Sequence, residues 1–535
     1  MCVGLAWCLW SIVRWLCRWR NLKRLAIGCG CLLLLLILLR VEENWRGKRA
    51  WDNFRREWEA KGEKFDFKAF VPPPVPADQN FALTPIVASC YGNILDTNGN
   101  RICPPTTNVV NRLELRIYGT GASVGKDPTN GSWSKGTLTD LRGWQEYYQS
   151  LLVTNESGAV THEFPVPTHP QTPGADVLLA LGKYDDALKE LAAASRLPAS
   201  RFPLNYDSEN PAAILLPHLS AMKMCAQTLQ LRALAELEAG QSAQACEDTV
   251  LIFQLTEKFP NDPLLIDHLV RIAMMQIAVQ AVYEGLAAHR WTEADLVKLS
   301  AEIDRQNLAA DYQFTMRGEM AESVKLIDYW KKNPGELWRT FLVFQNLDAP
   351  HSPPWYAPAV ARLIPPGWFD QNKVNYCRLV AGTIIPIANE TNRTFSMKMY
   401  RQWEDRMGDY TPWAPFHFLH RMLVPALGAS TRKFALCQTA LNLADTAIAL
   451  EHYRLVKGNY PETLDVLAPQ FIAQLPTDPI GGKMLKYRRE AGGQFVLYSV
   501  GWNETDDGGV TVFREFSPNT VDMDKGDWVW RYPGK

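Results

Sequence analysis

An uncharged apolar run of 15 residues, from Leu25 to Leu39, constrains this chain more than any other feature of its sequence. As an α-helix the run would span about 22 Å, which is short for a hydrocarbon core of about 30 Å. Extension to residue 41 and snorkelling of the flanking Arg24 and Arg40 make up the difference. We therefore predict a transmembrane anchor over residues 25–41.

The charges around this run predict its orientation. Five basic residues precede it, and the chain has no acidic residue before Glu42. The positive-inside rule then leaves residues 1–24, a basic and aromatic leader, in the cytoplasm. The sequence after Leu39 offers no small-x-small cleavage site, which favours an uncleaved anchor over a signal peptide. The predicted location is the inner (cytoplasmic) membrane, with a single pass and an extracytoplasmic or periplasmic bulk.

Length and charge balance limit what the chain outside the membrane can be. At 535 residues the chain is too long for one ordinary core, so two or three folded units are expected. Lysines plus arginines number 56 and aspartates plus glutamates 57, which gives a formal net charge of -1. A chain balanced in this way has no overall field that attracts nucleic acid. We expect no nucleic-acid partner.

The placement of the cysteines gives one candidate disulfide. Five of the 11 cysteines lie within the first 31 residues, in the leader or the anchor. Of the others, Cys90 and Cys103 bracket a run from Gly92 to Gly99 that is predicted as a hairpin. In an oxidising compartment outside the cytoplasm such a pair can close a disulfide. We predict a bridge between Cys90 and Cys103.

Composition divides the rest of the chain into successive regions. Residues 42–79 are predicted as a charged helix followed by a stiff, proline-rich spacer. Residues 80–172 are rich in loops, with one alternating run, Arg112 to Tyr118, that predicts a strand. Residues 173–430 have the periodicity of amphipathic helices. The motif Leu181-Gly-Lys-Tyr-Asp-Asp-Ala187 resembles the core of a tetratricopeptide hairpin, so a repeat-like helical layer is expected.

A loop rich in proline and aromatic residues, 346–370, interrupts this helical region. Helices are predicted on its C-terminal side over about 371–386 and 414–428. Tryptophan and tyrosine give large contact area at small entropic cost, which suits a groove for peptide or glycan. The alternative is a loop that its own rings hold onto the neighbouring helices.

The last hundred residues have the clearest local pattern. A helix is predicted over 434–455, because apolar residues recur there three, four or seven positions apart. Gly458 stops this helix and Pro461 prevents its resumption. Strands follow over about 485–488 and 495–500, joined by a glycine turn. The chain is therefore predicted as α+β: a transmembrane helix, a mainly helical middle and a long C-terminal helix packed on a small antiparallel sheet.

Four motifs follow one another in this end of the chain: Lys457-Gly-Asn-Tyr-Pro461, Leu475-Pro-Thr-Asp-Pro479, Leu497-Tyr-Ser-Val-Gly501 and Asp506-Asp-Gly-Gly509. With the preceding helix, this order makes residues 431–535 resemble the globular head of type II secretion major pseudopilins. In that family the acidic loop binds calcium, an ion that prefers hard oxygen ligands. The resemblance implies a Ca2+ site with Asp506, Asp507 and Asp527 as first ligands and Asn503, Asp522 and Asp524 as reserves.

The whole layout carries a second resemblance. A basic leader, an anchor, a spacer, a helical middle and a pseudopilin-like end occur in this order in large uncharacterised membrane-anchored proteins of planctomycete and verrucomicrobial type, which the chain is similar to. That resemblance implies no activity.

Signatures of catalysis are sparse. The sequence has no His-Glu-x-x-His, no Cys-x-x-Cys and no dinucleotide fingerprint. We therefore assign no catalytic and no cofactor-binding residue. We expect a membrane-anchored binding or scaffolding protein of the cell envelope, with partners among the membrane, envelope or secretion proteins, and peptides or glycans. Two alternatives stay open: an envelope hydrolase with its site between the helical layer and the aromatic loop, and a secretion-system accessory protein.

Overall fold

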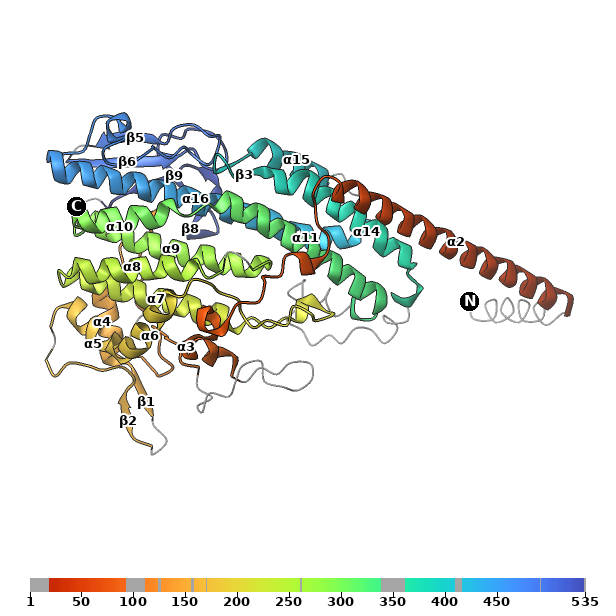
Figure 1. The fold of residues 1–535 in the computed structure, drawn as a ribbon, viewed down its shortest axis with the longest axis horizontal. Coiled ribbons are helices and arrows are strands. Elements are labelled where there is room, and N and C mark those ends of the chain that lie inside the picture. The colour runs from red at the N-terminus through yellow and green to blue at the C-terminus, as the bar shows by residue number, and fades with distance from the viewer. Residues whose placement is uncertain are drawn as a thin grey trace, which may run out of the picture. The chain divides into compact units, whose positions relative to one another are not determined.

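The computed structural model describes residues 19–92, 111–123, 127–154, 158–169, 171–259, 262–337, 361–408, 416–490 and 492–533. The chain divides into two compact units, one of residues 1–63, 327–378 and 410–422 and the other of residues 64–326, 379–409 and 423–535. Helices dominate the described residues, and the strands form small antiparallel sheets (Figure 1). The α+β class is confirmed in this general form.

The first unit contains the predicted anchor within one long helix, α2 (Trp19–Glu59) (Figure 1). Its apolar 18-residue window has no buried residue, which is compatible with a single-pass membrane anchor. The anchor and the charged helix after it were expected as neighbouring elements, and they form a single helix. Among the described residues, α9 (Leu265–Ala287) also has the length and composition of a span, but its window is 67% buried. We interpret α9 as a core helix.

Beyond the apolar run, α2 crosses α14 (Pro366–Leu379) with the two backbones in contact. A Cβ on Gly47 would lie 2.2 Å from the carbonyl oxygen of Gly367, so only glycine fits at the crossing. Asn44 Oδ1 accepts the backbone N–H of Gly367 at 2.9 Å, and the Trp368 indole donates to Glu43 at 3.1 Å. The bond to Asn44 satisfies a backbone N–H in the first turn of α14, where such groups have no partner within the helix.

The second unit begins with short elements. Its helical turns and short helices are η1 (Phe67–Ala69), η2 (Ala77–Gln79), η3 (Phe81–Leu83), α3 (Pro85–Ala88), η4 (Ser89–Tyr91), η5 (Trp133–Lys135) and α4 (Leu141–Ser150). Strands β1 (Leu152–Thr154) and β2 (Val160–His162) pair antiparallel.

The strand predicted from Arg112 to Tyr118 is not formed. Leu113, Leu115 and Ile117 are nevertheless buried, at 5% exposure or less. The Leu115 carbonyl accepts a hydrogen bond from the Thr228 hydroxyl at 2.7 Å instead of from a neighbouring strand. The alternation of the sequence thus matches the alternate burial of side chains, but the backbone is not paired as a strand.

A helical layer follows, in which α7, α8 and α9 lie side by side (Figure 1). Its elements are α5 (Pro173–Leu181), η6 (Gly182–Tyr184), α6 (Asp185–Ser195), η7 (Pro211–Ala213), α7 (Pro217–Glu238), α8 (Ser242–Thr256), α9, α10 (Glu293–Asp304) and α11 (Leu308–Lys332). A capping box, in which Thr292 and Asp295 bond each other's backbone N–H, begins α10. Past α14 the chain forms η8 (Val380–Ile384), η9 (Ile385–Ile387), the hairpin β3 (Ala388–Asn389) and β4 (Thr394–Phe395), and α15 (Met397–Gly408).

The C-terminal part contains the long helix α16 (Phe418–Lys457) and several strands. The two helices predicted over 414–428 and 434–455 are one continuous helix, so the boundary expected at residue 431 lies inside it. Gly458 has φ +83° and ends α16 as predicted. After η10 (Leu464–Leu467) come β5 (Lys486–Glu490), β6 (Gln494–Ser499), β7 (Thr511–Arg514), β8 (Ser517–Gly526) and β9 (Trp528–Arg531). The order β5-β6-β9 makes a three-stranded sheet, and β7 pairs with β8.

The sequence motifs of this end meet through hydrogen bonds. The Tyr460 hydroxyl donates to Glu451 at 2.8 Å, which ties the segment after α16 back to the helix. Glu451 also accepts from Arg454 at 2.7 Å and contacts His289 at 2.9 Å. Asp478 accepts the Ser499 hydroxyl at 2.8 Å, so the Asp-Pro turn is bonded to the end of β6. These motif residues hold the C-terminal part together.

Candidate functional site

The acidic loop predicted to bind calcium is organised around Asp527. This side chain is 1% exposed, and its carboxylate accepts the backbone N–H groups of Asp507, Gly509 and Val510 at 3.3, 2.6 and 3.3 Å. Burial raises its pKa, and these hydrogen bonds oppose the rise. Asp527 therefore holds the backbone of residues 507–510 in place through hydrogen bonds within the chain.

The other predicted ligands also have partners within the chain. Asp506 contacts Lys486 Nζ at 3.0 Å and accepts the Tyr498 hydroxyl at 3.0 Å; the hydrogen bond from Lys486 is the main cause that lowers its pKa. Asp507 accepts from the Asn503 amide at 3.0 Å. The reserve residues lie elsewhere: Asp524 pairs with Arg432 at 2.5 Å and Asp522 with Lys525 at 4.0 Å.

Asn503, Asp506, Asp507 and Asp527 thus lie in one loop region, whereas Asp522 and Asp524 lie on β8. Within the described residues, no three His, Cys, Asp or Glu side chains are arranged to hold a metal ion. An ion at Asp506 would have to replace Lys486, so the calcium site stays a prediction. The predicted disulfide also stays a prediction, because Cys103 lies outside the described residues.

One serine pattern was missed from the sequence. Gly121-Ala-Ser-Val-Gly125 matches the Gly-x-Ser-x-Gly of hydrolase elbows. An elbow needs a strand before the serine and a helix after it. Residues 120–123 form no extended strand, residues 124–126 lie outside the described part, and the next element is the short η5. The pattern lacks the context that would give it a function.

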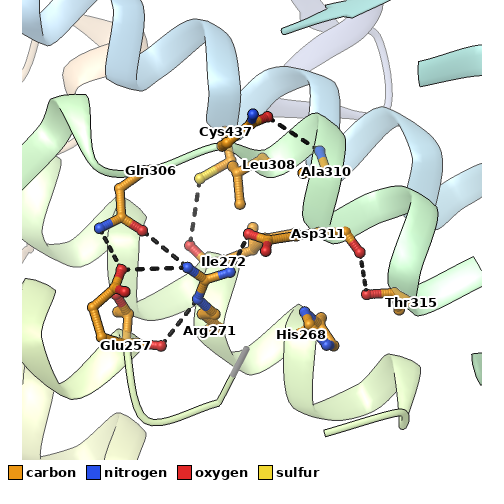
Figure 2. Close-up of polar contacts among 12 residues, drawn as sticks. Glu257, His268, Arg271, Ile272, Gln306, Leu308, Ala310, Asp311, Thr315 and Cys437 are labelled. Carbon is orange, nitrogen blue, oxygen red and sulfur yellow. Dashed lines mark hydrogen bonds and ion pairs between the residues drawn. The ribbon is translucent and has the colours of Figure 1, made fainter. Parts of the chain in front are cut away.

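Figure 2 shows a buried network around Arg271 of α9. The guanidinium is 3% exposed; it pairs with Asp311 and donates to Gln306 Oε1 and the Thr256 carbonyl, each at 3.0 Å. Glu257 lies 3.5 Å from it. The network joins α8, α9 and the start of α11. The hydrogen-bond donors of Arg271 are bonded to groups inside the protein. We interpret it as structural.

A second buried cluster is less well satisfied. His218 and Asp267 are both 0% exposed, and 3.9 Å separates His218 Nε2 from Asp267 Oδ2. Neither ring nitrogen of His218 nor either carboxylate oxygen of Asp267 has a hydrogen-bond partner among the described residues. Burial lowers the pKa of His218 to about 3, so the ring is neutral. The ring of Phe202 stacks on the His218 imidazole, with 4.0 Å between the ring centroids, and helps to shield the cluster from solvent.

The second unit contains an open cavity of about 1010 Å3, at the upper end of typical ligand sites. It is lined by the end of α10, by residues 386–399, by α16 and by residues 474–482. Hydroxyl and amide side chains dominate its polar lining, namely Asn389, Thr391, Asn392, Thr394, Ser396, Asn442, Gln474 and Thr477. Its charged lining residues are Asp304, Asp445, Glu504, Arg393 and Lys398.

Asp445 of α16 is the carboxylate with the most unusual surroundings in this cavity. Its side chain is 7% exposed, and its Oδ1 accepts the Ser300 hydroxyl of α10 at 2.6 Å. Its Oδ2 accepts no hydrogen bond from the residues that the structure describes. Burial raises the pKa of Asp445 to about 6. A buried carboxylate with one unused oxygen on a cavity wall can receive a donor from a ligand.

Comparison of the chain with protein-family models, with curated proteins and with solved structures gives no match. The assignment of a site therefore rests on the geometry. Our sequence reasoning missed Asp445, although one signal was present: it is the only charged residue between Phe434 and Leu450, in a stretch that is otherwise apolar or small and polar.

Proposed function

We propose that this protein is a single-pass, membrane-anchored binding or scaffolding protein of the cell envelope, with an extracytoplasmic bulk. The single observation that carries the proposal is the cavity of about 1010 Å3, whose polar lining of hydroxyl and amide groups suits ligand recognition. The exposed apolar face of α2 supports the anchor. The calcium-bound loop and the pseudopilin-like and tetratricopeptide-like character of the fold belong to this proposal as finer expectations.

The charges in the cavity favour binding over hydrolysis. Hydrolysis by acid and base needs two groups with separated proton affinities. Asp304 contacts Arg393 at 3.5 Å and Glu504 contacts Arg401 at 3.1 Å, so these carboxylates have cationic partners. Burial raises the pKa of Asp445, and its hydrogen-bond partner is the hydroxyl of Ser300 and not a second acid or base. The hydrolase alternative placed its site beside the loop 346–370, most of which lies outside the described residues.

One observation favours the secretion-accessory alternative. In the three-stranded sheet β5 is an edge strand, with three of its five residues exposed. An edge strand can pair with an extended segment of another protein. Lysine and arginine side chains line this edge, which also protects such strands against unwanted pairing.

A topology reporter and a ligand panel test the proposal on the full-length protein. A reporter fused after residue 70 should be active only outside the cytoplasm, and cytoplasmic activity would reverse the orientation. In detergent, a panel of oligosaccharides and short peptides should contain ligands that raise the thermal midpoint. The gain should shrink in Thr477→Trp, which places a bulky ring on the cavity wall and narrows the cavity. Turnover of fluorogenic esters or glycosides would support the hydrolase instead.

A further inference from the structure

The cavity contains a feature that indicates which ligand group it receives. Asp445 is more than nine-tenths buried, yet it lines an open cavity of about 1010 Å3. A buried carboxylate is costly unless a cation or several donors satisfy it. Among the described residues Asp445 has one donor, Ser300, and no cationic group within ion-pair distance. Its second oxygen is therefore available to a ligand.

The nearby basic residues that the structure describes form no direct ion pair with Asp445, although the charge of Arg393 acts to lower its pKa against the effect of burial. Arg393 donates to the Asp304 carbonyl at 3.0 Å and contacts the Asp304 carboxylate at 3.5 Å, so its fork is directed at Asp304. Lys398 is exposed, and solvent screens its charge. Asn442, one turn before Asp445, donates to the Thr477 carbonyl at 2.8 Å and accepts from Gln438 at 2.9 Å. Arg393 and Asn442 therefore donate to other groups, and Lys398 forms no ion pair with Asp445 among the described contacts.

Geometry also distinguishes between the two common cations. A guanidinium binds a carboxylate best through two parallel hydrogen bonds, one to each oxygen. Because Ser300 donates to Oδ1, a guanidinium that bonds both oxygens of Asp445 would have to share Oδ1 with this hydroxyl, whereas Oδ2 is open. An ammonium is a compact charge that needs single acceptors in several directions. The site therefore fits an ammonium better than a guanidinium.

We propose that this cavity binds a primary ammonium group, such as a lysine side chain of a peptide or a free alkylamine, with Asp445 Oδ2 as its acceptor. This inference rests on the proposed binding function and adds the chemistry of the ligand. The charged groups that face the site are Asp304, Arg393, Lys398 and Glu504, and Ser300 is its hydrogen-bond partner.

The test uses the full-length protein in detergent and isothermal titration with a capped Gly-Gly-Lys-Gly-Gly peptide. Its Nε-acetyl-lysine form, an arginine form and n-butylamine are the comparison probes. We expect acetylation to weaken binding at least tenfold and arginine to bind several-fold more weakly. Affinity should fall as the pH is lowered from 7.5 to 5, because protonated Asp445 carries no charge. If n-butylamine binds as tightly as the lysine peptide, the site recognises free amines. If the peptide binds more tightly, the site recognises lysine side chains. Both results support recognition of an ammonium group.

Two variants separate recognition from folding. Asp445→Asn keeps size and the Ser300 contact and should weaken the lysine peptide at least tenfold, whereas Glu462→Gln, which changes an exposed carboxylate outside the cavity lining, should change it less than threefold. Ser300→Ala frees Oδ1 and should raise arginine binding relative to lysine, a change that damage to the fold would not produce. Equal binding of lysine and acetyl-lysine, or wild-type affinity in Asp445→Asn, would overturn the inference. If neutral ligands bind in the cavity and amines do not, the inference fails alone; if nothing binds, the proposed function fails as well.

Discussion

Two buried carboxylates lie less than two helical turns apart on α16, and their pKa values shift in opposite directions. Glu451 is 1% exposed and Asp445 7%. Burial raises the pKa of Glu451, but hydrogen bonds from Arg454 and His289 outweigh it and lower the pKa to about 2. Burial also raises the pKa of Asp445, and there the rise prevails, to about 6.

The difference between them lies in their partners. The carboxylate of Glu451 is hydrogen-bonded to Arg454, His289 and Tyr460, so the protein itself satisfies both of its oxygens. The carboxylate of Asp445 accepts one hydrogen bond, from the hydroxyl of Ser300, and faces a cavity. A carboxylate that the chain has satisfied stabilises the fold, whereas one that the chain has left half satisfied is available to a ligand.

The largest effect is expected for Glu451→Gln. Lowering of the pKa from 4.5 to about 2, at 1.36 kcal/mol per pH unit, corresponds to about 3 kcal/mol of stability at pH 7. Because the folded pKa is the lower one, this stabilisation is present above the unfolded pKa and is lost as the pH falls from about 4.5 towards 2. Urea unfolding of the variant and the wild type, at pH 7 and pH 3, measures both parts.

Glu462→Gln is the matched control. Glu462 pairs with Arg489 but is 81% exposed, so its removal should change stability by less than about 1 kcal/mol. A loss at Glu451 no larger than this control would show that its three partners do not stabilise the helix end.

Asp445→Asn should have the opposite sign. A folded pKa of about 6 lies above the unfolded value of 3.8, so the charged form opposes folding, and the cost appears as the pH rises from about 4 to 6. The neutral variant should therefore be more stable than the wild type by up to about 3 kcal/mol at pH 7.5, and equal to it at pH 4. Urea unfolding at both pH values checks this. Destabilisation at pH 7.5 would mean that Asp445 is satisfied in the protein by a partner that its contacts do not include.

The contrast also explains what the sequence could predict. The helix over 434–455, its end at Gly458 and the hairpin of β5 and β6 follow from periodicity and glycine turns, which are local properties. The run from Arg112 to Tyr118 shows the limit. Its alternation predicted a strand, and alternate side chains are buried, but strand pairing depends on residues far away in the sequence, and Thr228 of α7 takes the place of a neighbouring strand. The joining of two predicted helices into α16 was missed for a similar reason, since packing overrides a weak local break.

The site was predicted less well than the fold. Sequence reasoning favours places where acidic residues are dense, such as Asp506 and Asp507, because density is visible in one dimension. Whether a carboxylate is free depends on partners that are far away in sequence, as Ser300 is from Asp445. A lone acid in an apolar helix is the signal that would have found it.

A smaller effect is expected at Asp527, a satisfied carboxylate in the acidic loop. Asp527→Ala removes the acceptor of three backbone N–H groups and should cost about 2 kcal/mol. Asp506→Ala removes an exposed pair with Lys486 and should cost less than about 1 kcal/mol. Urea unfolding ranks the two variants. Equal losses would show that Asp527 does not anchor the loop.

The smallest effect is expected from calcium. It tests whether the carboxylates of the acidic loop are satisfied by the chain, as Glu451 is, or are open to a ligand, as Asp445 is. If the loop binds calcium weakly, a millimolar concentration stabilises the folded protein by RT ln(1 + [Ca2+]/Kd), which is about 0.4 kcal/mol when the two are equal. Lys486 and Asn503 already contact Asp506 and Asp507, so the ion has to displace them and the rise in the thermal midpoint should be about 1 °C. The double variant Asp506→Asn, Asp507→Asn should lose this rise, and magnesium, which demands a tighter octahedral site, should not reproduce it. No rise at ten millimolar calcium would place the loop with the carboxylates that the chain has satisfied by itself, and would leave Asp445 as the open one.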